Sequence, residues 1–253
     1  MIKRLRIIAG PNGSGKSTLM HRLEKDYAVN FYDFLNADDI FAEVRNTGAY
    51  QPSFSVDADS LLVYAQNSSY DEATKAFFLN GKIEIANDCV RFHLPESINS
   101  YTIALLTNFL QHESVVQGRS FSQETVFSHS SKIEALRFAR ESGYRIYLYF
   151  VATSSPRINL SRVANRAKQG GHDVPEDKVI SRYTRSIELL PQALPYLSRA
   201  YFFDNSSDSM SYLCQWNPEE GLSPAAPGVI YPRWMSGVLS SIGEVFVPGV
   251  GPK

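Results

Sequence analysis

The sequence contains little cysteine, and this shortage excludes two classes of protein. Its 253 residues include only two cysteines, Cys89 and Cys214, which lie far apart along the chain. A disulfide scaffold needs more cysteines, and a zinc site held by cysteines needs them at closer spacing. We therefore expect two free thiols in a protein of the reducing cytoplasm.

Two further absences concern the surroundings and partners of the protein. No apolar run approaches the roughly 20 residues of a membrane span, and the N-terminus lacks the pattern of a signal peptide. The net charge is −1 and the pI is about 6.5, so there is no global basic excess of the kind that nucleic-acid-binding proteins carry. These features predict no membrane contact, disfavour a nucleic-acid partner and favour a small anionic ligand.

One stretch near the start does carry a strong signal for chemistry. It matches the phosphate-binding pattern G-x-x-x-x-G-K-S, in which glycines let backbone N–H groups face a polyphosphate. Lysine in this pattern reaches the outer phosphates, and serine can bind Mg²⁺. A glycine-rich turn without a ligand has no need of these two residues. The predicted nucleotide-binding residues are Gly10, Pro11, Asn12, Gly13, Ser14, Gly15, Lys16, Ser17 and Thr18.

The surroundings of this stretch support the same interpretation. Residues 5–9 are mostly apolar and predict a buried strand that enters the loop, and residues 16–23 predict the helix that leaves it. The partial positive charge of the helix N-terminus would then lie beneath the phosphates.

A pair of carboxylates, Asp38 and Asp39, follows a second predicted strand at residues 31–36. Ligands of open α/β sheets collect beyond the carboxyl ends of the strands, so a carboxylate there could accept a hydroxyl proton or hold Mg²⁺ through water. Alternatively, one of the two is the N-cap of a helix that begins near Ile40. Because adjacent helical residues point about 100° apart, we expect only one to face a cleft.

Residues 48–100 depart from a minimal nucleotide-binding core. We expect a helix at 57–66, a capping box that begins with Ser69 and opens a helix ending near Leu79, and a β-hairpin around Asn87 and Asp88. This insertion is either a lid beside the acceptor site or a structural cover for a sheet edge.

A third predicted strand, residues 118–125, ends in Glu124 and Thr125. Burying an unpaired carboxylate is costly, so Glu124 should bind a cation, a donor or substrate hydroxyls. The alternative is a structural pairing with an arginine. Ser131 and Glu134 match another capping box, which predicts the start of the next helix.

The clearest strand, residues 144–152, is followed by two basic helices joined by a Gly-Gly sequence at 170–171. Glycine pairs permit hinge-like backbone angles, so the helices could form a mobile lid whose guanidinium groups stabilise a transferring phosphoryl group. The alternative is a solvated basic surface. The cations on these helices are Arg162, Arg166, Lys178, Arg182 and Arg185.

Taken in order, these segments resemble the zeta toxin family of P-loop kinases. The resemblance spans residues 4–205 and rests on 10–18, 36–40, 124–128, 159–166 and the run from 170 through 175 to 182–186. It implies phosphoryl transfer from ATP or GTP, with Mg²⁺, to a sugar 3′-hydroxyl of UDP-N-acetylglucosamine. It also implies a separately encoded antitoxin as a partner.

The resemblance also suggests roles for individual residues. Asp38 matches the base that accepts the hydroxyl proton, and Glu124 matches a sugar-binding carboxylate. Lys16 and Ser17 match the phosphate and Mg²⁺ ligands. Arg162 or Arg166 matches the arginine that stabilises the phosphate. We assign further substrate contacts to Asp39, Thr125, His172 and Arg182.

This chain departs from the family at two places, near residues 171–173 and at 126–128, where better-studied members carry arginines. The acceptor therefore stays open. A kinase of nucleosides or nucleic-acid ends is one alternative, and a toxin-like module that binds nucleotide without catalysis is another.

The fold class that we predict is α/β: a P-loop kinase-like parallel five-stranded sheet flanked by helices, with a helical and β-hairpin insertion and an irregular C-terminal extension. We expect residues 1–205 to form the kinase domain. Residues 206–253 are rich in Ser, Pro and Gly, and we expect them to pack on the same domain, with Trp216 and Trp234 as anchors.

Overall fold

A computed structural model describes residues 2–169 and 174–243, and the chain divides into two compact units. The first unit combines Met1–Phe31 with Ser122–Lys253, and the second comprises Tyr32–Phe121. The second unit contains the predicted insertion at 48–100 and extends beyond it on both sides. None of the helices in the described residues is both long and apolar enough for a membrane crossing.

The sheet of the first unit has the strand order β10-β9-β8-β7-β1-β6. Strand β7 pairs in parallel with both β1 and β8, whereas β9 pairs antiparallel with β8 and β10. The sheet is therefore parallel at its centre and antiparallel at one end. Its strands are β1 (Arg4–Ala9), β6 (Phe121–Thr125), β7 (Arg145–Ala152), β8 (Arg199–Asp204), β9 (Ser211–Asn217) and β10 (Gly221–Pro224).

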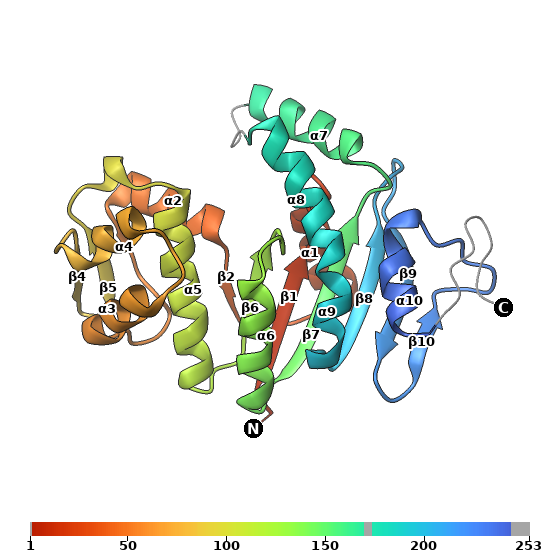
Figure 1. The fold of residues 1–253 in the computed structure, drawn as a ribbon, viewed down its shortest axis with the longest axis horizontal. Helices are drawn as coiled ribbons and strands as arrows, with labels where there is room; N and C mark the ends of the chain where they lie inside the picture. Colours follow the sequence, from red (N-terminus) through yellow and green to blue (C-terminus); the bar gives the residue numbers. More distant parts are fainter. Residues whose placement is uncertain (1, 170–173, 244–253) are drawn as a thin grey trace. The chain divides into compact units, whose positions relative to one another are not determined.

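Helices cover both faces of this sheet. Figure 1 shows α6, α9 and α10 in front of the strands and α1 behind them. Strands β1 and β7 are accordingly apolar over most of their length, and Ile7, Ile8, Leu148 and Phe150 are each 0% exposed. The helices of this unit are α1 (Lys16–Tyr27), α6 (Ser131–Glu141), α7 (Pro156–Lys168), α8 (Glu176–Glu188), α9 (Leu190–Ala193) and α10 (Ser236–Ser241).

The predicted α/β class, with a mostly parallel sheet flanked by helices, is confirmed. The predicted five strands did not include β9 and β10, because residues 206–253 were expected to be irregular. Trp234 in that extension is 5% exposed, and its Nε1 donates to Asp204 Oδ2 at 2.8 Å. Its ring centroid lies 5.7 Å from that of Phe150. The extension is thus anchored on the end of β8.

The second unit combines helices with a small antiparallel sheet of strand order β3-β5-β4. The predicted hairpin is present as β4 and β5. Asn87 and Asp88 in its turn have φ values of 53° and 61°, the left-handed region that tight hairpin turns require. The elements are β2 (Asp33–Leu35), α2 (Ala37–Thr47), β3 (Ala49–Tyr50), α3 (Ala58–Asn67), α4 (Glu72–Leu79), β4 (Ile83–Ala86), β5 (Cys89–Phe92) and α5 (Ser100–Val116).

Two predicted capping boxes were wrong. The N-cap of α4 is Asp71 rather than Ser69, because the Asp71 carboxylate accepts the Thr74 N–H at 2.8 Å. Helix α6 begins at Ser131 itself, and its N-cap Ser130 makes no side-chain bond. The Ser131 hydroxyl lies 2.9 Å from His129 Nδ1 and so has another partner.

Candidate active site

The loop between β1 and α1 has the backbone that a phosphate-binding loop requires. Gly10, Gly13 and Gly15 have φ values of 151°, 74° and 100°, which L-residues rarely adopt. A Cβ at Gly10 would lie 2.0 Å from the Val151 carbonyl oxygen, so the loop also packs too closely for a side chain there. The predicted strand, loop and helix are therefore confirmed as structural elements.

Lys16, Ser17 and Glu124 meet beside this loop. Lys16 is only 8% exposed; its Nζ donates to the Pro11 carbonyl oxygen at 3.3 Å and lies 3.7 Å from Glu124 Oε1. Ser17 Oγ donates to Glu124 Oε2 at 3.3 Å. The carboxylate that ends β6 thus pairs with the lysine of the loop, not with an arginine.

Thr125 is engaged in the local backbone. Its Oγ1 accepts the Phe127 N–H at 3.1 Å, and its carbonyl oxygen accepts the Gly10 N–H at 3.3 Å. Phe127 has a φ of 56°, so the Thr125 hydroxyl supports a left-handed turn directly after β6. These bonds tie the end of β6 to the start of the loop.

The donors of this loop fit a polyphosphate. The amides of Gly13 and Gly15 donate no hydrogen bond within the described part of the chain, and the fully buried Ser14 hydroxyl also has no partner there. Gly15 is the N-cap of α1 and supplies no side-chain acceptor. Together with the Lys16 ammonium and the Ser17 hydroxyl, these groups suit phosphate oxygens and a Mg²⁺ that keeps most of its water ligands.

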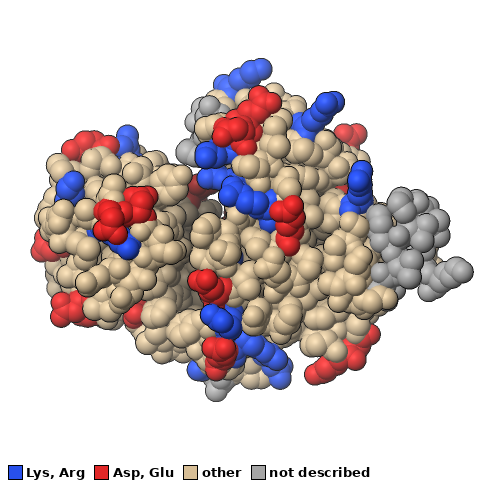
Figure 2. Space-filling model, viewed as in Figure 1, with Lys and Arg blue, Asp and Glu red and all other residues tan. Residues whose placement is uncertain are grey.

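The predicted arginines lie on the helical pair α7 and α8. Arg162 is partly buried, and its NH1 donates to the Asn205 carbonyl oxygen at 2.8 Å. Arg166 is exposed on α7, and Arg182 is partly buried on α8. Figure 2 shows Lys and Arg side chains at the surface of this region. A shared apolar cluster joins the two helices: Leu160, Val163, Val174 and Val179.

One predicted substrate residue cannot be placed. His172 lies in the segment 170–173, outside the described residues, and so does the Gly-Gly sequence of the predicted hinge.

Sequence reasoning missed two asparagines that contact the loop. Asn159 Nδ2 donates to the Asn12 carbonyl oxygen at 2.5 Å, and Asn205 Nδ2 donates to the Ser14 carbonyl oxygen at 2.8 Å. A signal for Asn159 was available, because this polar residue lies one turn before Val163 on the buried face of an amphipathic helix. For Asn205 the signal was its place at the polar end of the last predicted strand, residues 199–205, which sequence reasoning put near the nucleotide base and not against the loop.

The second unit places both predicted carboxylates in the first turn of α2, and both are exposed. Neither is the N-cap, because α2 begins at Ala37 and the Asn36 side chain accepts the Asp38 N–H at 3.0 Å. The Asp39 carboxylate acts electrostatically on Tyr50. Burial, followed by the charges of Glu43, Asp33 and Asp39, raises the pKa of Tyr50 to about 12.

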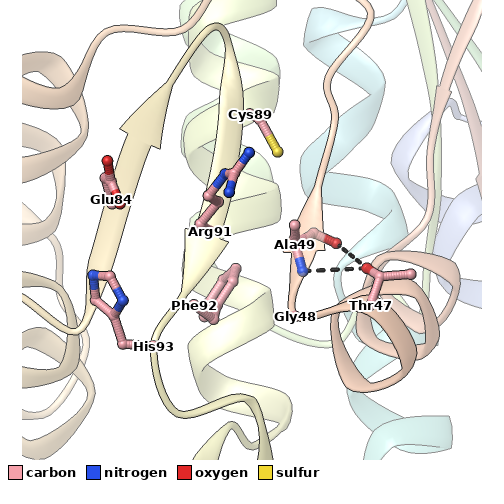
Figure 3. A pocket seen from close by; sticks show the side chains of 8 residues that line it. All are labelled: Thr47, Gly48, Ala49, Glu84, Cys89, Arg91, Phe92 and His93. Carbon is pink, nitrogen blue, oxygen red and sulfur yellow. Dashed lines mark hydrogen bonds between the residues drawn. The ribbon is translucent and has the colours of Figure 1, made fainter.

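A separate hollow of about 460 Å³ lies in the second unit and is lined by residues of its small sheet and of the end of α2 (Figure 3). None of the residues predicted for the site lines it. Its lining is Thr47, Gly48, Ala49, Glu84, Cys89, Arg91, Phe92 and His93.

Comparison with known sequences supports the nucleotide-binding part of this interpretation. The family model described as an AAA domain matches residues 5–77, which include the whole loop. An uncharacterized protein of Haemophilus influenzae is 35% identical over 74 residues, a match that covers 29% of this chain and 53% of the relative. The chain therefore matches about half the length of that curated relative.

Solved structures show a related fold. The native AvrRxo1-ORF1:-ORF2 complex has a TM-score of 0.52 at 16% identity, and the match covers 88% of this chain and 61% of that chain. The complex with ATP gives a TM-score of 0.51 with the same identity and coverage. The chain has a P-loop kinase-like fold. A structure from the PezAT toxin-antitoxin system of Streptococcus pneumoniae has a TM-score of 0.48 at 12% identity, too low to support an inference.

Proposed function

We propose that the chain is a Mg²⁺-dependent kinase that transfers the γ-phosphoryl group of ATP or GTP to a hydroxyl of a small acceptor, with a nucleotide sugar such as UDP-N-acetylglucosamine as the first candidate. The observation that carries the proposal is the meeting of Glu124 with Lys16 and Ser17, at 3.7 and 3.3 Å. The lysine and serine of the loop suit phosphate oxygens and Mg²⁺. The added carboxylate supplies an acceptor for a metal-bound water or a substrate hydroxyl.

The donor half of the reaction rests on the loop. The amides of Gly13 and Gly15 and the Lys16 ammonium would hold the phosphates, and Ser17 would hold Mg²⁺. The Glu124 carboxylate, which lies beside the Ser17 hydroxyl, would accept from a water of the metal. Bound Mg²⁺ would neutralise charge on the phosphate oxygens. The AvrRxo1-ORF1:-ORF2 structure with ATP supports ATP as a nucleotide that this fold accommodates.

For the acceptor half, we propose the roles that the resemblance to zeta toxins implies. Asn36 caps α2, so the exposed Asp38 carboxylate is not consumed as a helix cap and can serve as the base. Arg162, held by its bond to Asn205, would stabilise charge on the transferred group, with Arg166 as the alternative. The further acceptor contacts that we propose are Asp39, Thr125, His172 and Arg182.

We also infer a separate protein partner of the antitoxin kind. Its support is the resemblance to zeta toxins and the similar fold of a chain in the AvrRxo1-ORF1:-ORF2 complex. Co-purification of the tagged chain with the products of neighbouring genes tests this inference, and a chain that purifies alone would contradict it.

A transfer assay tests the reaction itself. The protein is incubated with γ-labelled ATP or GTP, Mg²⁺ and a panel of nucleotide sugars, nucleosides and short RNAs, and the labelled product is identified. We expect label on a nucleotide sugar, loss of transfer in Glu124→Gln, and normal transfer in the matched control Glu134→Gln, an exposed residue of α6. Labelled RNA would favour the nucleic-acid alternative. ATP binding without transfer to any acceptor would contradict a kinase.

A further inference from the structure

Two asparagines hold the nucleotide-binding loop from two separate elements. Asn159 on α7 donates from Nδ2 to the Asn12 carbonyl oxygen at 2.5 Å. Asn205, directly after β8, donates from Nδ2 to the Ser14 carbonyl oxygen at 2.8 Å. Both hydrogen bonds are accepted by backbone carbonyl oxygens of the loop, so they do not depend on the side chains of the loop residues.

Each asparagine is itself fixed. Asn159 is 0% exposed, and its Oδ1 accepts the hydroxyl of Thr153. The Asn205 backbone N–H donates to the Ala152 carbonyl oxygen at 2.8 Å, and its own carbonyl oxygen accepts from Arg162 at 2.8 Å. Since each Nδ2 faces a carbonyl oxygen, which can only accept, the orientation of both side-chain amides follows from their partners.

Because the peptide bond is planar, each of these two contacts also fixes the direction of the N–H group that follows the bound carbonyl. No peptide bond is cis in the described residues, and in a trans peptide the carbonyl and the next N–H point in opposite directions. Holding the Asn12 carbonyl toward Asn159 therefore directs the Gly13 N–H away from Asn159. Holding the Ser14 carbonyl toward Asn205 directs the Gly15 N–H away from Asn205.

The loop glycines fit closely against these asparagines. A Cβ at Gly13 would lie 2.7 Å from the Asn159 carbonyl oxygen, and a Cβ at Gly15 would lie 2.4 Å from Asn205 Nδ2. A side chain at either position would push the loop off its support. These two glycines are therefore required by the packing of the asparagines as well as by their φ values.

We propose that Asn159 and Asn205 are positioning residues that orient the Gly13 and Gly15 amides toward the phosphates of the bound nucleotide. The inference rests on the proposed function, namely that this loop binds ATP. Donors that are already oriented cost no reorganisation when the anion arrives, so fixing them strengthens phosphate binding. The Asn205 carbonyl oxygen also accepts from Arg162 of α7, so the same residue contacts both the loop and this arginine.

The test compares ligands that differ in their phosphates. Binding of ATP, inorganic tripolyphosphate and adenosine is measured by calorimetry for the unaltered protein, Asn159→Ala and Asn205→Ala. We expect each variant to bind ATP and tripolyphosphate about tenfold more weakly, which corresponds to about 1.4 kcal/mol. Adenosine affinity should stay the same. The matched control is Asn165→Ala, on the exposed side of α7, which should change none of the three.

Other outcomes distinguish a failure of this inference from a failure of the proposed function, ATP binding by the loop. If the variants bound ATP and tripolyphosphate as the unaltered protein does, or lost adenosine affinity equally, the inference would be overturned. If the unaltered protein bound neither ATP nor tripolyphosphate, the proposed function would fail, and the inference with it. Should Asn159→Ala not fold, Thr153→Val provides a milder test, because it keeps the Asn159 side chain and removes the hydroxyl that contacts the Asn159 Oδ1 and the Ser155 carbonyl oxygen. Its loss should be smaller, with the same phosphate selectivity.

Discussion

The two units begin their helices in different ways. In the second unit, α2, α3, α4 and α5 each begin at an Asn or Asp whose side chain accepts a backbone N–H of the first turn. In the first unit, Ser155 caps α7 in the same way, whereas α1, α6 and α8 have no side-chain cap. The four caps of the second unit are Asn36, Asp57, Asp71 and Asn99.

This difference indicates where an anion can bind. The first N–H groups of a helix have no partner within the helix, and a capping side chain satisfies some of them. A capped N-terminus is thus partly closed to a ligand, whereas α1, which follows Gly15, keeps its donors open beside Lys16. The uncapped start of α1 therefore fits the proposed phosphate site, whereas the capped helix starts of the second unit contribute to stability.

The largest expected effect removes the charge at the open helix start. Lys16→Ala should lower phosphoryl transfer by about two to three orders of magnitude and weaken ATP binding, because a buried cation aimed at the phosphates is lost. Transfer rates and calorimetric ATP affinity measure both effects. Lys25→Ala, an exposed residue in the last turn of the same helix, is the control. Unaltered ATP affinity in Lys16→Ala would remove this loop from nucleotide binding.

The next effect concerns a carboxylate of the second unit. Asp38→Asn should lower transfer about a hundredfold while leaving ATP affinity nearly unchanged, because a base acts on the acceptor. Asp59→Asn is the matched control, since Asp59 also lies exposed in the first turn of a capped helix. Turnover like that of the unaltered protein would exclude Asp38 as the base.

Loss of a cap in the second unit should act on stability alone. Asn99 Oδ1 accepts the N–H groups of Tyr101 and Thr102 at 2.9 and 3.0 Å. Asn99→Ala should lower the free energy of unfolding by about 1 kcal/mol and leave ATP affinity unchanged. Urea unfolding followed by circular dichroism measures the change, with Asn165→Ala as a variant that removes no cap. A loss of ATP affinity would show that the division of labour between the units is wrong.

Acid should weaken the second unit through two of its caps. Backbone hydrogen bonds, chiefly from Ser60 and Thr74, hold the pKa values of Asp57 and Asp71 below the ordinary value of 3.8. Because the folded-state pKa is the lower one, the stabilisation is present above pH 3.8 and disappears as the pH falls through the folded value. Thermal midpoints measured in this range should fall less for the double variant Asp57→Asn, Asp71→Asn. Parallel curves would contradict this origin.

The smallest expected effect is a difference in thiol reactivity between the cysteine of the first unit and the cysteine of the second unit. Burial raises the pKa of Cys214 in the first unit to about 12, despite a hydrogen bond with Tyr231 that lowers it. Its thiol should therefore not react with a thiol reagent at neutral pH, whereas the partly exposed Cys89 of the second unit should react. Cys89→Ser should abolish labelling of the native protein, and denaturant should restore one reactive thiol. Labelling of native Cys89→Ser would show that Cys214 is accessible.

Local patterns predicted what depends on nearby residues. The loop at 10–17, the hairpin around Asn87 and Asp88, and the strand at 145–152 were all predictable, because turn chemistry and periodicity act over a few residues. Helix starts were less predictable. The N-caps of α2 and α4 are Asn36 and Asp71, although neighbouring residues have a similar capping propensity. Which residue becomes the N-cap depends on where the preceding chain bends. Those bends are set by packing.

The sequence by itself determined that the chain has a loop able to hold polyphosphate, because glycine, lysine and serine at those spacings carry the chemistry within nine residues. Only the tertiary structure decided how that loop is held. Glu124, Asn159 and Asn205 reach it from three other elements, separated from it by more than a hundred residues of chain. The sequence can mark such residues as polar groups in buried or strand-end positions, but it does not give their partners, which depend on the order of strands in the sheet.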